Sequence, residues 1–461
     1  MQYLGVSYDP GTVPLLDPDF IPFGVWMEAY LQGASQPLAI AVERNEGQIT
    51  VRRTFIHGTP EMEQADYRYV ERMVKFLLWS IGGFRISICG CSPIAKRLQK
   101  DYAPTGQRAF DFDFFHKLYE VDLEILDLPL EACPQPKEVP RPLGGHLDGC
   151  RIGFDAGGSD RKVSAVIDGE TVYSEEVVWF PKINSNPDYH YEGIVAALKS
   201  AAAHMPRVDA VGVSSAGIFI NNRTMAASLF LQVPKDLFDR KVKDIYIRAI
   251  TDTFGPIPYS VVNDGDVSAL AGAISLEDTN ILGIAMGTSE AVGYVDEQGR
   301  ITGWLNELAF VPVDASPNAM EDEWSHDIGC GVKYFSQDSV IKLAPAAGIA
   351  LDAALSPAEK LKAVQKLMEE GDDRAAAIYR SIGTYLAHTL VLYHDLYGFR
   401  SVLLLGRVMS GKGGDTLLET CRKVLASEYP EVCGKINIAL PDERFRRVGQ
   451  SAAAASLPEV K

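Results

Sequence analysis

An acidic residue, a glycine pair and a hydroxyl residue stand between two apolar segments near the middle of the chain. Asp155 is followed by Gly157, Gly158 and Ser159, and the apolar segment after them turns back at an Asp-Gly pair. This pattern is typical of a β-hairpin whose tip carries free backbone N–H groups beside a carboxylate. The N–H groups can bind phosphate oxygens, and Asp155 can orient Mg²⁺, directly or through water. An ordinary hairpin turn is the alternative interpretation.

A second acidic group follows a short apolar segment and precedes a run of small residues typical of a helix. It consists of Asn263 and Asp264. The Asp264 carboxylate can accept the proton of a hydroxyl that attacks phosphorus. Helix capping is the alternative, because Asn and Asp are both favoured at the N-cap. The two roles are compatible, since Asp264 and Asp266 can divide them.

A second glycine and hydroxyl turn lies at Gly287, Thr288 and Ser289, between an apolar segment and its returning partner. Taken alone it predicts only a hairpin, but together with the first turn it predicts two turns that face one phosphate group. Asn306 and Glu307 follow, a polar pair that can bind sugar hydroxyls. A plain surface loop is the alternative for that pair.

A third glycine loop, containing Gly406 and Arg407, ends the apolar segment 403–405. Ligands bind at the carboxyl ends of strands in α/β sheets, so this loop is expected to cover an adenine and a ribose. The loop also imitates the start of a Walker sequence. Gly413 stands where that motif needs a Mg²⁺-binding Ser or Thr, which excludes a Walker site.

Strands and helices alternate from residue 150 onward, which predicts an α/β fold. We expect strands at 150–154, 162–167, 171–178, 210–214, 259–262, 280–286, 291–295, 401–405 and 435–439. We expect helices at 191–203, 235–254, 267–274, 357–368, 373–397, 416–427 and 447–457. Residues 136–149 are rich in Pro and Gly and predict a linker, so residues 1–135 are expected to form an additional N-terminal α/β domain of unknown role.

The composition is that of a globular protein, and it disfavours several kinds of partner. The 461 residues are 47% hydrophobic and 23% charged, as in a globular protein with two or three domains. The formal net charge of −17 disfavours nucleic acid and anionic membranes as partners. No apolar run predicts a membrane span, and no signal peptide is recognisable. The seven scattered cysteines favour reduced thiols, and hence the cytoplasm.

The order and spacing of these elements resemble the sugar-kinase, heat-shock-protein-70 and actin superfamily of ATPases. Within it, the chain is most similar to the ROK family of bacterial sugar kinases and sugar-responsive repressors, over roughly residues 150–458. The resemblance implies a two-lobed, actin-like (ribonuclease H-like) ATPase fold. Residues 150–275 would form the first lobe, and residues 276–461 the second, including the C-terminal helix.

The resemblance also implies roles for single residues. Asp155 to Ser159 would be the first phosphate motif, Gly287 to Ser289 the second, and Gly406 part of the adenosine motif. Asn263 would bind sugar and Asp264 would be the catalytic base. Asn221 and Asn222 follow a strand and turn similar to those that lead to the family's sugar-contacting loop, and are candidate hydroxyl ligands together with Glu307.

Several positions depart from the family pattern. Phe310 stands where the family has a His that contacts sugar and zinc, and only Cys330 remains of the Cys-rich zinc loop, so no zinc site is expected. Glu290 follows the second phosphate turn where a small residue is usual, and its carboxylate would repel phosphate unless Mg²⁺ or a Lys intervenes. Arg407 replaces a glycine.

The sequence therefore predicts an ATP- and Mg²⁺-dependent enzyme that phosphorylates a hydroxyl of a hexose, an amino sugar or a related polyol. Two alternatives remain open. One is a catalytically weak sugar-sensing protein on the same scaffold, and the other is a superfamily ATPase that phosphorylates no small molecule. A homodimer is common among proteins with this resemblance.

Overall fold

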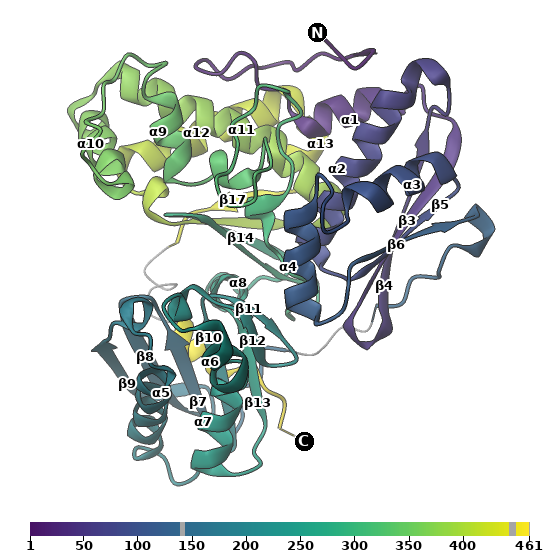
Figure 1. The fold of residues 1–461 in the computed structure, drawn as a ribbon. Coiled ribbons are helices and arrows are strands. Elements are labelled where there is room, and N and C mark those ends of the chain that lie inside the picture. The colour runs from purple at the N-terminus through teal and green to yellow at the C-terminus, as the bar shows by residue number, and fades with distance from the viewer. Residues whose placement is uncertain (139–142, 442–448, 461) are drawn as a thin grey trace.

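The computed structural model describes residues 1–138, 143–441 and 449–460. Residues 150–263 form a five-stranded sheet in the order β13-β10-β7-β8-β9 (Figure 1). The strands are β7 (Cys150–Ala156), β8 (Asp160–Ile167), β9 (Glu170–Val178), β10 (Ala210–Ser215) and β13 (Tyr259–Asn263). β7, β10 and β13 run parallel, β8 is antiparallel to β7, and β9 is antiparallel to β8. We call this sheet and the helices on its faces the first lobe.

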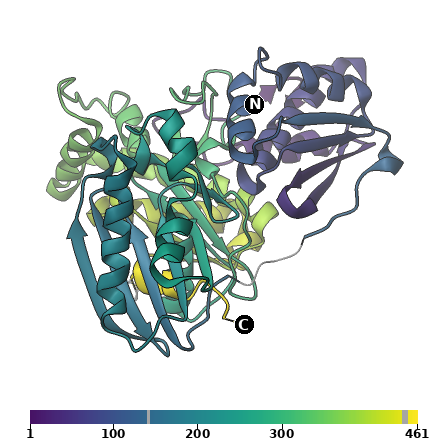
Figure 2. The same cartoon turned by 60° about the horizontal axis from the view of Figure 1, so that its bottom comes forward.

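Side chains along β7 alternate between the two faces of this sheet, and helices pack on both faces. Ile152 and Phe154 are fully buried in a cluster with α5 (Pro187–Ala202) and α7 (Ile245–Phe254). Gly153 faces the opposite way, against α15 (Gln450–Ala455), which lies behind the strands in Figure 2. A Cβ at Gly153 would lie 1.6 Å from the carbonyl oxygen of Ser451. Glycine is therefore required for α15 to pack so closely.

The position of α15 corrects the prediction that the C-terminal helix belongs to the second lobe. The helix packs on β7, β8 and β10 of the first lobe. It is also shorter than expected, and residues 447–448 of the predicted helix lie outside the described residues. The predicted helix at 235–254 is divided as well, into α6 (Lys235–Leu237), a π-turn (Phe238–Val242) and α7.

A second sheet has the order β15-β14-β16-β17, and we call it and the helices on it the second lobe. Its strands are β14 (Ile281–Met286), β15 (Glu290–Val295), β16 (Ser401–Leu405) and β17 (Asn437–Ala439). Its helices are α9 (Gln337–Leu343), α10 (Pro357–Glu370), α11 (Asp373–Tyr397), α12 (Gly411–Glu428) and α13 (Pro430–Cys433). α8 (Asp264–Leu276) leaves the first-lobe sheet and packs on β14 and β15. It therefore joins the two lobes.

Residues 1–128, which we call the N-terminal unit, have a sheet of their own in the order β4-β3-β5-β6. Its strands are β3 (Gln36–Arg44), β4 (Gln48–Ile56), β5 (Arg85–Cys89) and β6 (Glu124–Leu128), and a small ribbon of β1 (Gln2–Tyr3) and β2 (Val6–Ser7) precedes them. Its helices are α1 (Phe23–Leu31), α2 (Glu63–Ile81), α3 (Ser92–Asp101) and α4 (Ala109–Tyr119). Among the described residues, none of the helices is long and apolar enough to span a membrane.

The N-terminal unit shares one continuous apolar core with the second lobe. Trp79 of α2 lies with its ring centroid 4.6 Å from that of Phe310, and Phe76 packs at 6.3 Å from Tyr393 of α11. Buried charges reinforce this contact: the Lys75 ammonium lies 3.0 Å from Asp111 and 3.3 Å from Asp327 of the second lobe. Local sequence patterns do not predict this shared core, because the partners that meet in it are separated by more than 200 residues.

The segment that follows the N-terminal unit is held at several points. Lys137 pairs with Ile49 of β4, and Gly144 N–H donates to the carbonyl of Leu457. Residues 139–142 of the predicted linker lie outside the described residues. The described part of this segment therefore contacts both the N-terminal unit and the chain after α15.

Candidate functional site

The first predicted phosphate turn and the predicted base lie at the same edge of the first-lobe sheet. β10 pairs in register with both neighbours, so that Ser215 lies opposite Ala156 on one side and Asn263 on the other. The three parallel strands therefore end together. Gly157 to Ser159 continue from β7, and Asp264 continues from β13.

Asp155 points into this edge and is only 6% exposed. The hydroxyl of Ser214 on β10 donates a hydrogen bond of 2.8 Å to its carboxylate. Burial raises the pKa of Asp155 to about 6, and the charge of Asp264 adds to the increase. The Asp264 carboxylate is thus close enough to influence the titration of Asp155.

Asn263 and Asp264 begin α8, so the capping interpretation is confirmed for Asn263. Its side-chain oxygen accepts from the N–H of Gly265 at 2.7 Å, and its amide nitrogen donates to the carbonyl of Gly217 at 2.7 Å. Asp264 is the first helical residue, and burial raises the pKa of its carboxyl group. Asp264 Oδ1 also accepts from the N–H of Gly265, at 3.1 Å, so Asp264 takes part in the cap as well.

Two further carboxylates lie near Asp264. Asp266 accepts hydrogen bonds from Asn306 Nδ2 at 2.8 Å and from the N–H of Tyr294 at 3.2 Å, and burial raises its pKa to about 7. Burial also raises the pKa of Glu307 to about 7, and the charges of Asp264 and Asp266 contribute. Glu307 therefore lies beside the predicted base, as expected for an acceptor-binding residue.

The second phosphate turn and the predicted adenosine loop share an edge of the second-lobe sheet. β14 and β16 are parallel, with Ala285 opposite Leu405, so Gly287 and Gly406 follow neighbouring strand ends. A Cβ at Gly406, where φ is 93°, would lie 2.3 Å from the carbonyl oxygen of Met286, so glycine is needed there. Thr288, Ser289 and Arg407 are exposed at this edge.

The two lobes meet next to Asp264. A Cβ at Gly293 of β15 would lie 2.1 Å from the carbonyl oxygen of Gly265, so the backbones of β15 and α8 are in contact there. The second phosphate turn leads directly into β15. Val292 is the residue before Gly293, and Ser289 precedes Val292 by three residues. That separation is about 10 Å at roughly 3.3 Å per residue. This contact places the start of α8 between the lobes.

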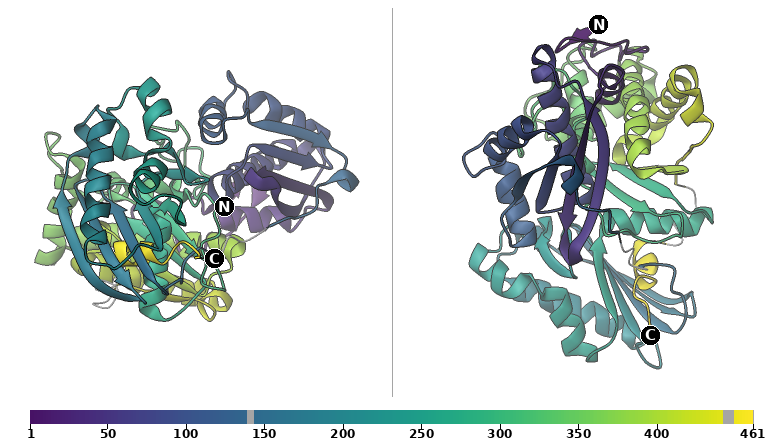
Figure 3. Two further views of the ribbon diagram at one scale, coloured as in Figure 1. Left: turned by 90° about the horizontal axis from the view of Figure 1, so that it is seen from below. Right: turned by 90° about the vertical axis from the view of Figure 1, so that its right-hand side faces the viewer.

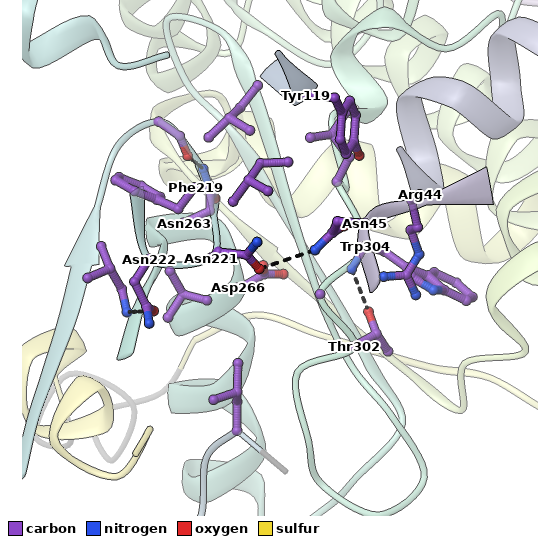
Figure 4. A pocket seen from close by; sticks show the side chains of 18 of the residues that line it. Arg44, Asn45, Tyr119, Phe219, Asn221, Asn222, Asn263, Asp266, Thr302 and Trp304 are labelled. Atoms are coloured by element: carbon purple, nitrogen blue, oxygen red, sulfur yellow. Dashed lines mark hydrogen bonds between the residues drawn. The ribbon is translucent and has the colours of Figure 1, made fainter. Parts of the chain in front are cut away.

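A cavity of about 80 Å³ lies beside Asn263 and Asp266 and is lined by all three parts of the molecule (Figure 4). The first lobe contributes the hairpin of β11 (Ile218–Ile220) and β12 (Arg223–Ala226). Asn221 and Asn222 form its turn, with φ of 55° and 66°. The side-chain oxygen of Asn222 accepts from the N–H of Val261 at 2.9 Å, so it anchors the hairpin to β13.

Several residues around this cavity had not been predicted. Asn45 comes from the tip of the β3–β4 hairpin, and its amide donates to the side-chain oxygen of Asn221 at 3.3 Å. The remaining unpredicted polar or aromatic residues lining the cavity include Arg44, Gln48, Tyr119, Thr302 and Trp304. For Trp304, the neighbouring Asn306-Glu307 pair was a local signal. Nothing near Asn45 in the sequence links it to Asn221.

The departures from the family pattern have structural explanations. Phe310 packs against Trp79 and, at 4.8 Å, against Trp324, so it serves the contact with the N-terminal unit. Glu290 is 3% exposed, and burial raises its pKa well above the ordinary value, with a contribution from Glu307. A neutral Glu290 would not repel phosphate.

The carboxylates at this edge of the first-lobe sheet are suitable ligands for Mg²⁺ bound beside a nucleotide. Within residues 1–138, 143–441 and 449–460, no group of three or more His, Cys, Asp or Glu is arranged to hold a metal ion on its own. Mg²⁺ commonly needs only one or two carboxylates, with water and phosphate oxygens as the other ligands. Asp155 and Asp264 provide such carboxylates. Gly157 and Gly158 have no side chains of their own to cover the backbone beside these carboxylates.

Comparison with known proteins bears on the fold. No family model matches the sequence, and no curated protein matches it significantly. Among solved structures, a ROK hexokinase from Thermus thermophilus superposes with a TM-score of 0.51 at 17% identity, covering 66% of this chain and 96% of the hexokinase. A ROK family transcriptional regulator, a homolog of the E. coli MLC protein, superposes with a TM-score of 0.50 at 15% identity, covering 68% of this chain and 78% of the regulator. Over about two-thirds of its length, the chain therefore has the fold of ROK proteins, as its sequence predicted.

Proposed function

We propose that this chain is an ATP- and Mg²⁺-dependent kinase that phosphorylates a hydroxyl of a hexose, an amino sugar or a related polyol. The observation that carries the proposal is the position of Asp264. This carboxylate begins α8 where the lobes meet, follows the strand beside the first phosphate turn, and lies near Asp155 and Glu307. The fold shared with a ROK hexokinase supports the same reaction class.

The residues divide into three groups with different tasks. The turns at 157–159 and 287–289 bind the phosphates of ATP through backbone N–H groups and hydroxyls, and the loop at Gly406 and Arg407 covers the adenosine. Asp155 would hold Mg²⁺, directly or through water, and the ion would neutralise phosphate charge. Asp264 accepts the proton of the acceptor hydroxyl as that oxygen attacks the terminal phosphorus.

The acceptor binds in the cavity beside Asn263 and Asp266, next in the chain to Asp264, with the hairpin at 218–226 as one wall. At about 80 Å³ this cavity is far below the 300 Å³ that is about the minimum for small-molecule sites. Acceptor entry therefore requires the lobes or the β3–β4 hairpin to move apart. Closure afterwards excludes water, which favours transfer to the acceptor over hydrolysis.

A sugar-sensing protein without significant turnover is the second candidate. The similar fold of a ROK transcriptional regulator favours it, because the same scaffold serves there in regulation. A superfamily ATPase that phosphorylates no small molecule would also use both phosphate turns. These candidates differ in how turnover depends on the acceptor.

The discriminating experiment measures ADP release by the full chain with Mg²⁺ and ATP, alone and with a panel of hexoses, N-acetylhexosamines and polyols. A kinase releases ADP at least tenfold faster with one class of acceptor, and the product gains one phosphate by mass. Sugar binding by calorimetry without ADP release would indicate the sensor. ADP release that no acceptor stimulates would indicate the ATPase.

A further inference from the structure

The loop between β9 and α5 is fastened to the first phosphate turn. Trp179 is 1% exposed, and its backbone N–H donates to the carbonyl of Ser159 at 3.1 Å. Its indole N–H donates to the carbonyl of Gly157 at 2.8 Å. Two bonds from one residue to both ends of the glycine turn fix the loop relative to that turn. A short 3-10 turn, Pro181–Ile183, then continues from Trp179.

Lys182, in the middle of this 3-10 turn, lies directly against the glycine pair. A Cβ at Gly158 would be 2.8 Å from Cε and 3.0 Å from Nζ of Lys182. The absence of a side chain at position 158 thus leaves the space through which the lysine reaches the turn. The side chain of Lys182 is exposed, so its ammonium can meet a ligand from solvent.

Among the described residues the Lys182 ammonium has no partner, in contrast to Lys162 beside the same turn. Lys162 on β8 has carboxylates of Asp160 at 3.5 Å and Glu176 at 3.7 Å. Within the described part of the chain, no hydrogen bond or ion pair holds the ammonium of Lys182. Its positive charge nevertheless reaches Asp264, since it lowers the pKa of that carboxyl group against the larger effect of burial. A cation without a partner among the described residues therefore lies against the first phosphate turn, within electrostatic reach of the proposed base.

We propose that Lys182 is a catalytic residue that binds the terminal phosphate of the nucleotide and stabilises the negative charge on the phosphoryl group during transfer. This inference rests on the proposed kinase function. In the transfer, the bond from the terminal phosphorus to the bridging oxygen breaks, and ADP leaves with the electron pair. The acceptor oxygen forms the new bond to phosphorus, and its proton passes to Asp264. Lys182 stays protonated throughout and donates hydrogen bonds only.

The test compares Lys182→Gln and Lys182→Arg with wild type and with Lys199→Gln, which removes an exposed lysine from α5 of the same lobe. Calorimetry measures the binding of Mg²⁺ with AMPPNP and of Mg²⁺ with ADP, and a coupled assay measures kcat with the best acceptor. We expect Lys182→Gln to weaken AMPPNP binding at least tenfold, to leave ADP binding within about twofold, and to lower kcat about 100-fold. Lys182→Arg should recover part of both losses, and Lys199→Gln should match wild type.

The outcomes separate this inference from the function on which it rests. Wild-type kinase activity with unchanged AMPPNP affinity and kcat in Lys182→Gln would overturn the role of Lys182 alone. Equal weakening of AMPPNP and ADP, with a lowered melting temperature, would assign Lys182 to the structure of the loop and would also overturn it. Failure of the wild-type chain to bind either nucleotide would overturn both proposals.

Discussion

The backbone N–H of Glu307 donates a hydrogen bond of 2.9 Å to the carbonyl of Trp79, in the last turn of α2. The two preceding residues continue the pattern: Asn306 N–H donates to Ser80 at 2.9 Å, and Leu305 N–H to Ile81 at 3.2 Å. The last carbonyls of a helix have no partners within it, so this loop satisfies them. The N-terminal unit therefore fixes the position of the proposed acceptor-binding carboxylate.

The same unit also contacts the first lobe across the cavity. Glu120, at the end of α4, forms ion pairs with Arg223 at 2.7 Å and Lys243 at 2.8 Å. The right panel of Figure 3 shows the long β3–β4 hairpin extending from the N-terminal unit toward the first lobe. Since this unit shares its core with the second lobe, these polar contacts connect the two lobes.

Replacing Asp264 by Asn should abolish most of the transfer reaction. The amide keeps the shape of the side chain but cannot accept the hydroxyl proton. We expect kcat to fall by about 10² to 10⁴, with nucleotide affinity changed much less. Acceptor-dependent ADP release measures the effect, and Asp113→Asn, at an exposed position on α4, is the matched control. Retention of more than a tenth of the wild-type kcat would rule out Asp264 as the base.

Activity should fall on acidification. Asp155 has a pKa raised to about 6 and Glu307 one raised to about 7, and the proposed mechanism uses both in their ionised forms. We therefore expect kcat/KM to rise with pH through about 6 to 7. Glu307→Gln removes a negative charge beside Asp264 and should move this rise to lower pH. A profile that stays flat down to pH 5 would contradict the raised pKa values.

The raised pKa of Glu307 also predicts a pH-dependent effect on stability. A carboxyl group whose folded-state pKa is raised binds its proton more tightly in the folded chain. Its contribution to stability is complete below the unfolded-state pKa, near 4, and is lost as pH rises through about 7. Glu307→Gln should thus melt a few degrees above wild type at pH 8, with a smaller difference at pH 5. An equal or lower melting temperature at pH 8 would contradict this sign.

Breaking the buried ion pairs of Lys75 should destabilise the whole chain. Lys75→Met leaves Asp111 without its cation, in a region with no access to water. We expect a loss of about 3–5 kcal/mol in the free energy of unfolding, measured in urea. Arg85→Met is the control, because Arg85 is 40% exposed and pairs with exposed Glu124, and it should cost about 1 kcal/mol or less. Equal losses in the two variants would contradict a structural role for the buried cluster.

Asn45→Ala should weaken acceptor binding without affecting nucleotide binding. Asn45 lies on the cavity wall and holds Asn221, yet it belongs to no element that carries a phosphate turn. We expect the acceptor KM to rise about tenfold, or about 1.4 kcal/mol, with the ATP KM within twofold. Asn318→Ala, in a loop away from the cavity, is the control. Parallel increases in both KM values would show that the variant disturbs the lobes generally.

Local patterns predicted much of the fold. The helix at 373–397 and the strand at 401–405 have the bounds expected from their apolar periodicity. α12 begins earlier than expected, at Gly411, and its Gly413 and Gly414 pack against Tyr379 and Met409, where a Cβ would not fit. Glycine is usually read as a helix breaker, so close packing of this kind is hidden from propensity.

The part of the site that depends on distant contacts could not be predicted. Asp155 lies in the last residues of β7 and Asp264 directly follows β13, and strand ends carry a recognisable sequence pattern. Asn45 and Lys182 reach the site only through tertiary packing. The shared core of the N-terminal unit and the second lobe positions Asn45, and Trp179 positions Lys182. The location of α15 has the same cause, since Gly153 and Gly212, where a Cβ would clash with α15, lie about 240 to 300 residues earlier in the chain.

A crystal structure of the full chain with Mg²⁺, AMPPNP and the best acceptor tests most directly whether the two glycine turns and Asp264 act on one triphosphate. We predict the terminal phosphate between the turns at 157–159 and 287–289, with an acceptor hydroxyl within hydrogen-bonding distance of the Asp264 carboxylate. A nucleotide bound elsewhere, or an acceptor whose hydroxyls all lie beyond reach of Asp264, would contradict the proposed phosphoryl transfer.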